Sequence, residues 1–281
     1  MIMKNQQKGE FGKIHHNVSL RKLNAWRIGG EAEHYFSPKT LKDCQNFLKQ
    51  YPKDKDITWL GLGSNMLIRD QGVSGCVIHT LSGMRDKYYD KSRAMFYVQA
   101  GVPCCQLSRF VARNHHHKAE FLAGVPGTMG GALAMNAGAH GAELWEFVEA
   151  VDVINRAGEI IHVSASEYIV GYRHAYPKPE RLDLQNTWFV AAYLKFPKGD
   201  MRTGLQKIGD LLAIRARTQP INQPSCGSVF RNPPQTYAAK LIEASGLKGH
   251  RVGKAEVSLK HANFIVNLGG ASSSDVEQII T

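Results

Sequence analysis

Long apolar runs are missing from this sequence of 281 residues. No stretch reaches the roughly 18 to 20 consecutive apolar residues that a membrane-spanning helix needs. The first residues, MIMKNQQKGEFGKIHHN, contain no apolar segment of the kind found in secretory signals. Hydrophobic residues make up 43% and charged residues 21%, which excludes the disordered and collagen-like classes. We therefore expect a folded cytoplasmic protein without a membrane partner.

Cysteine is scarce, and its spacing argues against disulfides and zinc. The five cysteines are an odd number and include no C-x-x-C pair. Three adjacent histidines, His115 to His117, cannot all face one ion from a single strand or helix, and no second ligand cluster accompanies them. The sequence predicts no metal site, and we expect the three histidines to lie in a solvated loop.

Acidic residues are in deficit, with 24 Asp and Glu against 35 Lys and Arg, for a net charge of +11. Such an excess raises the local concentration of anions. The basic residues are spread along the whole chain, with no basic run, zinc-finger motif or RNP motif. Small anionic ligands are therefore favoured over nucleic acid, with a basic nucleic-acid-binding protein as the less favoured alternative.

Strand-like and helical segments occur together, which indicates the α+β class. Short apolar segments bounded by turn residues predict strands over residues 57–62, 76–78, 96–99, 148–154, 160–163 and 188–196. Helical spacing of apolar residues occurs over residues 41–51, 107–113, 204–217 and 237–245. Pro197, Gly199 and Gly204 flank a short polar segment, so a domain boundary is expected near residue 200.

Two glycine-rich stretches suggest a ligand held by backbone groups. AGVPGTMGGALAMNAGAHG (123–141) has almost no charge and six glycines. Without Cβ atoms, such a backbone can approach a ligand and donate N–H groups to phosphate or ring carbonyl oxygens. LGLGSNMLIRD (60–70) places G-x-G-S-N at the end of a predicted strand, which suits a diphosphate. The dinucleotide fingerprint G-x-G-x-x-G is not completed there, and a tight buried turn is the alternative.

These stretches, preceded by WRIGGEAE (26–33), resemble in sequence and order the turns of the UDP-N-acetylenolpyruvoylglucosamine reductases of peptidoglycan synthesis. Five later segments look like that family's motifs in the right order: YRHAYP, RARTQP, PSCGSVFRNP, AAKLIEASGLKG and KHANFIVN. The resemblance runs from about residue 20 to the end. Because no long insertion separates Trp188 from Gly204, it is closest to the group that lacks an extra substrate-covering loop.

The resemblance implies a fold and a reaction. It implies an FAD-binding domain of the vanillyl-alcohol-oxidase (PCMH) type over residues 20–200 and a smaller α+β substrate-binding domain over residues 201–281. It also implies a protein that holds FAD, takes electrons from NADPH and reduces UDP-N-acetylglucosamine enolpyruvate to UDP-N-acetylmuramate; separately, we expect a monomer. Another flavin-dependent oxidase or dehydrogenase of the same fold is the alternative. The cofactor contacts that it implies are Arg27, Gly29, Gly61, Gly63, Ser64, Asn65, Gly124, Pro126, Gly127, Thr128, Gly130, Gly131, Asn136, Ala137, Gly138 and Arg215.

The same resemblance assigns two catalytic residues. Hydride added to the terminal carbon of an enolpyruvyl group leaves negative charge on the neighbouring carbon and its carboxylate. Arg173 would stabilise that charge and bind the substrate, and the Ser228 hydroxyl would supply the proton. Ala175 stands where the family usually has Ser, so a hydrogen bond from that position is not expected. Cys226 is expected to pack, with a flavin-linked role as the alternative.

Three expectations concern the rest of the C-terminal part. Asn232 and His261 occupy motif positions that contact the UDP-sugar in relatives, with a structural role as the alternative for His261. Ser274 and Glu277 have the spacing of a capping box at a helix start. No residue matches the family's catalytic glutamate near the C-terminus, so the active site of the chain as given is expected to be incomplete.

Overall fold

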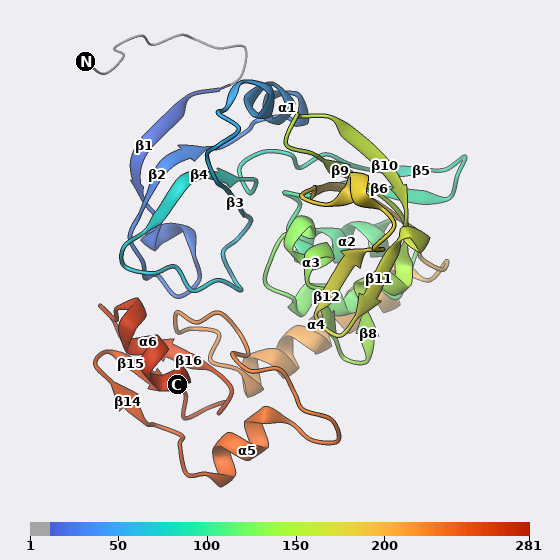
Figure 1. Ribbon diagram of the computed structural model, residues 1–281. Helices are drawn as coiled ribbons and strands as arrows, with labels where there is room; N and C mark the ends of the chain where they lie inside the picture. Colours follow the sequence, from blue (N-terminus) through green and yellow to red (C-terminus); the bar gives the residue numbers. More distant parts are fainter. Residues whose placement is uncertain (1–11) are drawn as a thin grey trace, which may run out of the picture.

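The first lobe is a four-stranded sheet covered by one helix, drawn in blue and cyan in Figure 1. A computed structural model describes residues 12–281. The sheet has the order β1-β2-β4-β3, with β1 antiparallel to β2 and the other pairs parallel. Its elements are β1 (Ile14–Ser19), η1 (Arg21–Leu23), β2 (Glu31–Phe36), α1 (Leu41–Gln50), β3 (Ile57–Leu60) and β4 (Val73–His79).

Helix α1 follows from its local sequence. The Thr40 hydroxyl accepts the N–H of Asp43, and the Asp43 carboxylate accepts the N–H of Thr40, so a capping box starts the helix. Cys44, Phe47 and Leu48 then lie on one face and are fully buried against the sheet. This packing supports the strand that ends at the first glycine-rich turn.

The second lobe is a five-stranded antiparallel sheet of order β10-β9-β13-β6-β5, with its helices packed on one face. The sheet strands are β5 (Lys87–Asp90), β6 (Met95–Gln99), β9 (Val148–Ile154), β10 (Ile160–Ser164) and β13 (Trp188–Leu194). The helices are α2 (Cys104–Arg113), η2 (Glu120–Gly124), α3 (Met129–Ala134), η3 (Leu144–Phe147), η4 (Ala165–Glu167) and η5 (Leu182–Leu184). Two hairpins complete it: β7 (Gly138–Ala139) with β8 (Ala142–Glu143), and β11 (Tyr168–Gly171) with β12 (His174–Pro177).

Helix α4 (Met201–Thr218) leads from the second lobe to the C-terminal unit, drawn in orange and red in Figure 1. Ile208 of α4 packs with Ala112 and Ala123 of the second lobe. The domain boundary expected near residue 200, just before α4, stays a prediction. The unit itself contains α5 (Ala238–Ala244), β14 (Arg251–Val252), β15 (Ala255–Val257), β16 (Ile265–Asn267) and α6 (Ser273–Ile280).

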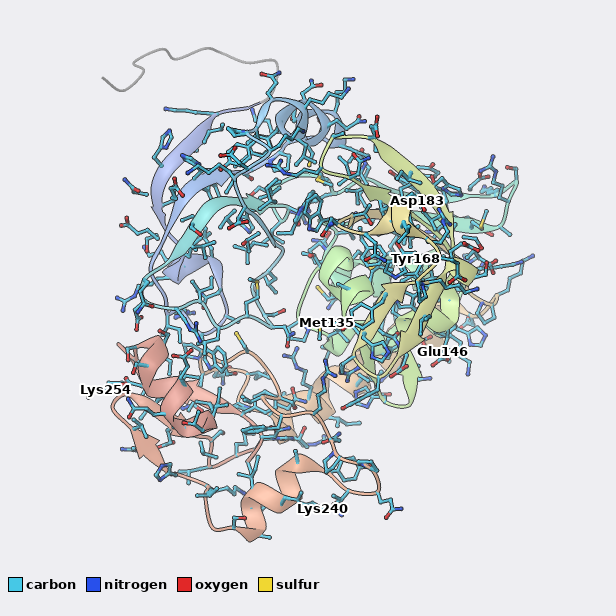
Figure 2. All side chains as sticks on the ribbon, viewed as in Figure 1. Met135, Glu146, Tyr168, Asp183, Lys240 and Lys254 are labelled. Carbon is cyan, nitrogen blue, oxygen red and sulfur yellow. The ribbon has the colours of Figure 1, made fainter. Side chains whose placement is uncertain are left out.

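The C-terminal unit shares its core with the first lobe. Trp26 and Ile28 are buried together with Ala255, Ile265 and Val276. The Trp26 indole N–H donates to the Ile265 carbonyl at 2.7 Å. Figure 2 shows two lysines of this unit, Lys240 on α5 and Lys254 between β14 and β15. No helix in the described part of the chain is long and apolar enough to cross a membrane.

All six strands and four helices expected from the sequence are present, most of them with shifted ends, and two local predictions were wrong. His116 is only 4% exposed, because its ring packs edge-on against Phe96 and its Nδ1 lies 2.7 Å from the Asn114 carbonyl oxygen. It therefore does not lie in a solvated loop, whereas His115 is exposed. Within residues 12–281, no three metal-ligating side chains cluster.

The helix cap near the C-terminus was the second wrong prediction. The capping residue of α6 is Ser272 rather than Ser274: its hydroxyl accepts the N–H of Asp275, whose carboxylate accepts the N–H of Ser272. An aspartate can complete a capping box as a glutamate does. Of the two possible pairs, Ser272 with Asp275 and Ser274 with Glu277, the first forms the box. Glu277 instead pairs with Arg69, at 2.8 Å.

Candidate functional site

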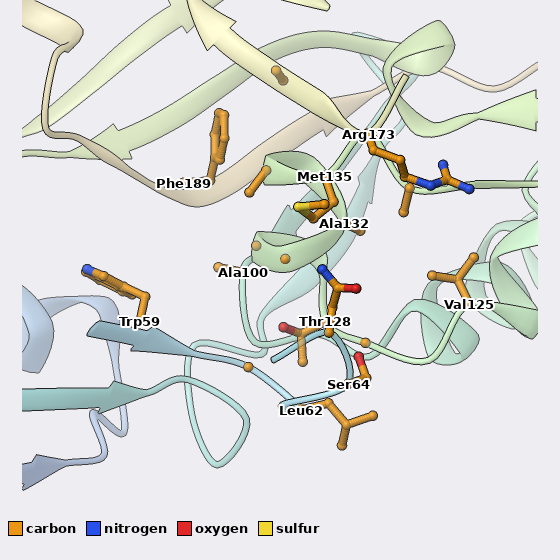
Figure 3. Close-up of a pocket in the computed structure, with 18 of the residues that line it drawn as sticks. Trp59, Leu62, Ser64, Ala100, Val125, Thr128, Ala132, Met135, Arg173 and Phe189 are labelled. Carbon is orange, nitrogen blue, oxygen red and sulfur yellow. The ribbon is translucent and has the colours of Figure 1, made fainter. Parts of the chain in front are cut away.

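A cavity of about 700 Å³ lies where the two lobes, α4 and the C-terminal unit meet. Figure 3 shows its central part, with Ser64 and Leu62 from the first lobe and Thr128, Met135 and Arg173 from the second. Its size is in the range of cofactor-binding pockets. Two residues, Arg173 and Arg215, are the only charged residues that line it within the described chain.

The first wall is the turn after β3. Gly63 has φ +65°, and a Cβ there would lie 2.5 Å from the Leu23 carbonyl oxygen, so only glycine fits. The Ser64 hydroxyl donates to the Pro126 carbonyl oxygen and so joins the two glycine-rich stretches. Among the hydrogen bonds of residues 12–281, the backbone N–H groups of Ser64 and Asn65 have no acceptor.

The second wall is the stretch around α3. Backbone N–H groups of Met129 and Gly130 donate to the carbonyls of Val102 and Ala100, each at 2.9 Å, and hold this wall against the second sheet. The N–H of Gly131 finds no acceptor within the described residues. A Cβ added at Gly131 would meet no atom within 4 Å. Because Gly131 lines the cavity and has no side chain, there is space beside it for a ligand.

Arg173 lies in the tight turn between β11 and β12, at φ +63°. Its Nη1 and Nη2 donate to the carbonyl oxygens of Asn136 and Gly138 at 3.2 and 3.1 Å, and its guanidinium lies over the Tyr172 ring at 4.8 Å. These contacts use backbone carbonyls and no carboxylate, so the positive charge of Arg173 is left for a ligand.

Arg215 projects from the last turns of α4. Its Nε donates to the side-chain oxygen of Gln219 at 3.0 Å. Partial burial lowers the pKa of the Arg215 guanidinium from its ordinary value, because the charged form loses solvation. Two arginines without a facing carboxylate favour an anionic ligand.

The Cys226 to Ser228 loop closes the cavity from the C-terminal unit. The Cys226 thiol is 6% exposed and donates towards the carbonyl oxygens of Met66 and Gly63, at 3.4 and 3.5 Å. Burial raises the pKa of this thiol to about 11. Cys226 packs with Trp26, as expected, and also lines the cavity. Ser228, two residues further on, is exposed and lines the cavity.

Comparisons with known proteins agree with this geometry. A model of the FAD binding domain matches residues 32–164, and one of the UDP-N-acetylenolpyruvoylglucosamine reductase C-terminal domain matches residues 219–281. The reductase of that name from Methylococcus capsulatus is 51% identical over 91% of this chain and 82% of its own length. That from Legionella pneumophila (strain Paris) is 47% identical over 96% of this chain and 87% of its own.

The chain belongs to the UDP-N-acetylenolpyruvoylglucosamine reductase family.

A solved structure supports the same assignment at the level of the fold. The UDP-N-acetylenolpyruvylglucosamine reductase from Thermus caldophilus aligns with a TM-score of 0.82 at 31% identity, over 96% of this chain and 94% of that one. The predicted fold, an FAD-binding domain of the PCMH type followed by the family's C-terminal domain, is confirmed.

Most site residues expected of this reductase line one cavity. These are Gly61, Gly63, Ser64, Asn65, Gly124, Pro126, Gly127, Thr128, Gly130, Gly131, Ala137, Gly138, Arg173, Arg215 and Ser228. The open amides of the two walls and the space beside Gly131 fit a dinucleotide with a diphosphate. The family's cofactor is thus compatible with the residues present.

Three of the expected cofactor contacts lie outside the lining. Asn136 is 1% exposed, and its side chain is committed to Glu143, the Gly171 carbonyl and the Trp145 N–H. Gly29 lies against Ile68, where a Cβ would be 2.6 Å from the carbonyl oxygen, and the adjacent Arg27 is exposed. Contacts of Arg27, Gly29 and Asn136 with the cofactor therefore stay predictions, and Asn136 is here a structural residue of the second wall.

The two expected sugar contacts also lie outside the lining. The Asn232 side-chain oxygen accepts the N–H of Ala238 at the start of α5, at 3.1 Å. His261 Nδ1 accepts the N–H of Asn263 at 3.3 Å, and burial lowers the pKa of the imidazole. Their roles towards the sugar stay predictions, beside the structural roles seen here.

Several lining residues were missed. They include Trp59, Tyr168, Tyr176, Trp188, Phe189 and Gln219. In the sequence the tryptophans and Phe189 read as apolar residues of predicted strands. No local signal separates a strand residue that faces a ligand from one that faces the core.

Proposed function

We propose that this reductase uses FAD, bound in the cavity, and NADPH to convert UDP-N-acetylglucosamine enolpyruvate to UDP-N-acetylmuramate for peptidoglycan precursor synthesis. Family membership and the FAD-domain match support this function. The structural observation that carries it is the charge of the cavity, which has two arginines and no carboxylate on its described lining. Such a cavity suits the diphosphates of a dinucleotide and a nucleotide sugar.

FAD held between the two glycine-rich walls would supply hydride transfer from NADPH to the terminal carbon of the enolpyruvyl group. Arg173 would bind the substrate carboxylate and stabilise the negative charge that develops beside it. Its two backbone contacts hold the plane of the guanidinium before substrate arrives. The Ser228 hydroxyl would donate its proton to the carbon next to the carboxylate.

The proposal includes action as a monomer in the cytoplasm. NADPH and UDP-sugars are the expected cytoplasmic reactants. Sedimentation equilibrium of the flavin-loaded protein would check the monomer.

The test is a three-step absorption experiment. The purified protein, with FAD added where needed, is expected to show an oxidised flavin spectrum, to lose it on anaerobic addition of NADPH, and to regain it on addition of the enolpyruvyl UDP-sugar. The product should be heavier than the enolpyruvyl UDP-sugar by the mass of two hydrogen atoms. A protein that bleaches with NADPH but is not reoxidised by this substrate would support another flavin-dependent dehydrogenase instead. If the protein takes up no FAD, both the proposed reductase function and the alternative dehydrogenase function are excluded.

A further inference from the structure

The side chain of Asn136 links three segments around the turn that carries Arg173. Its Nδ2 donates to the Glu143 carboxylate at 2.7 Å and to the Gly171 carbonyl oxygen at 3.2 Å. Its Oδ1 accepts the backbone N–H of Trp145 at 3.2 Å. Both side-chain N–H groups and the side-chain oxygen therefore have partners within the protein.

The carboxylate of Glu143 lies close to Arg173 without pairing with it. A Cβ added at Gly138 would be 2.9 Å from the Cγ of Glu143 and 3.4 Å from the Nη1 of Arg173, so both groups lie beside the same point. Among the ion pairs of residues 12–281, none joins these two side chains. The Glu143 carboxylate is instead held by Asn136 and by the backbone N–H of Glu146.

A carboxylate at this distance could compete with the substrate for Arg173. A guanidinium binds a carboxylate at two points, and a pair formed within the protein would use the same donors as the substrate. The two groups that Arg173 does contact are the carbonyl oxygens of Asn136 and Gly138, which orient the guanidinium without cancelling its charge. Asn136 thus supplies one anchor for the cation with its backbone and holds the neighbouring anion with its side chain.

The backbone conformation of Asn136 does not by itself account for an amide side chain here. The residue has φ +38°, in the left-handed region, where asparagine is tolerated better than most residues. Glycine is tolerated there at least as well, but it has no side chain to hold Glu143. Figure 3 shows Arg173 beside Met135, the residue before Asn136. The amide is therefore best explained by what it contacts.

We propose that Asn136 is a positioning residue, which holds Glu143 away from Arg173 and so leaves the guanidinium free for the substrate carboxylate. Without the amide, the Glu143 carboxylate turns towards Arg173, and the substrate has to displace it. This inference rests on the proposed function, because it takes a UDP-sugar with a carboxylate as the ligand. It predicts a loss of binding that is confined to ligands with that carboxylate.

The test removes the amide and keeps the backbone. Asn136→Gly retains the left-handed conformation and the carbonyl that anchors Arg173. Calorimetric titrations of the flavin-loaded protein compare UDP-N-acetylmuramate, which has the carboxylate, with UDP-N-acetylglucosamine, which lacks it. Asn136→Gly should weaken binding of the first at least roughly tenfold, the scale of a hydrogen bond to a charged group, and of the second less than about twofold. Asn17→Gly is the matched control, since Asn17 has φ +52° and lies outside the cavity lining.

A second substitution distinguishes positioning from a general structural role. In Asn136→Gly/Glu143→Gln the competing charge is gone, so this double variant should bind UDP-N-acetylmuramate within about threefold of Glu143→Gln alone. In anaerobic stopped-flow, Asn136→Gly should bleach with NADPH within about twofold of the wild-type rate, while it needs more enolpyruvyl UDP-sugar for half-maximal recovery of flavin absorbance. If Asn136 only stabilised the wall, Glu143→Gln would not restore binding.

The outcomes separate the two proposals. If Asn136→Gly binds UDP-N-acetylmuramate as the wild type does, or if Glu143→Gln does not restore the loss, the positioning role is wrong while the proposed function stands. If the wild-type protein neither binds UDP-N-acetylmuramate nor is reoxidised by the enolpyruvyl UDP-sugar, the proposed function fails, and this inference fails with it. Should Asn136→Gly not fold, as judged by circular dichroism, Asn136→Ser, whose shorter neutral side chain cannot reach all three partners, decides through the same comparisons.

Discussion

Replacing Arg173 by lysine keeps a positive charge at the cavity and removes the planar, two-point donor. In the structure Nη1 and Nη2 are anchored on the carbonyl oxygens of Asn136 and Gly138. A lysine ammonium cannot keep both anchors and still hold a carboxylate at two points. The loss of two partly exposed hydrogen bonds should lower the free energy of unfolding by only about 1–2 kcal/mol. Loss of a fixed donor for the developing charge should cost about 2.7–4 kcal/mol, or 10²–10³ in rate.

The two halves of the reaction separate these effects. In anaerobic stopped-flow, Arg173→Lys is expected to bleach with NADPH within about twofold of the wild-type rate, because the substrate carboxylate is absent from that half. Recovery of flavin absorbance with the enolpyruvyl UDP-sugar should be about 10²–10³ slower. Arg93→Lys is the matched control, since Arg93 is exposed and lies 3.8 Å from Asp90, outside the cavity lining. Recovery in Arg173→Lys within fivefold of wild type, or equal slowing of both halves, would refute the assigned role.

Three further predictions test the proton donor, the cavity wall and a buried histidine. Ser228→Ala should slow recovery of flavin absorbance about 10²–10⁴-fold while bleaching by NADPH stays unchanged, and recovery at the wild-type rate would require another proton source. Gly131→Val should change the free energy of unfolding of the flavin-free protein, followed in urea, by less than about 1 kcal/mol. Gly131→Val should nevertheless weaken flavin binding at least fivefold, because the added side chain enters the cavity and overpacks it at a cost of roughly 1–3 kcal/mol. An unchanged affinity for the flavin would mean that residue 131 does not face the ligand. Burial lowers the pKa of His79 from its ordinary 6.5. As the pH falls below 6.5, the unfolded chain therefore binds a proton at His79 before the folded protein does, and the free energy of unfolding should fall. Urea titrations of wild type and His79→Gln at pH 5 and 7.5 check this, and an equal pH dependence in both would rule His79 out.

The elements that the sequence predicted are those determined by neighbouring residues. Helix α1 has its cap at Thr40 and its apolar face within one short segment, and both formed as the pattern indicates. The glycine-rich walls were also recognisable, because a position such as Gly63 accepts no other residue without a clash. Helix caps, apolar helix faces and positions that accept only glycine can all be predicted from a few adjacent residues of the sequence.

The residues that were misplaced depend on distant partners. Asn136 lies in a glycine-rich motif, where an amide could serve a ligand or the protein. The structure commits it to Glu143, Gly171 and Trp145, and no local pattern contains that information. Likewise, His116 is buried because Phe96 of β6 packs against it, which an adjacent run of histidines does not indicate.

The two proposed catalytic residues are positioned by different glycine-rich walls. Arg173 is anchored on Asn136 and Gly138, which belong to the second wall. The Ser228 loop is instead tied through the Cys226 thiol to the carbonyls of Gly63 and Met66 in the first wall. Ser64 joins the walls by its bond to Pro126. The separation of cation and proton donor therefore depends on the spacing of the two walls. A dinucleotide that fills the cavity between them would fix that spacing before substrate binds, which gives the cofactor a positioning effect in addition to its chemistry.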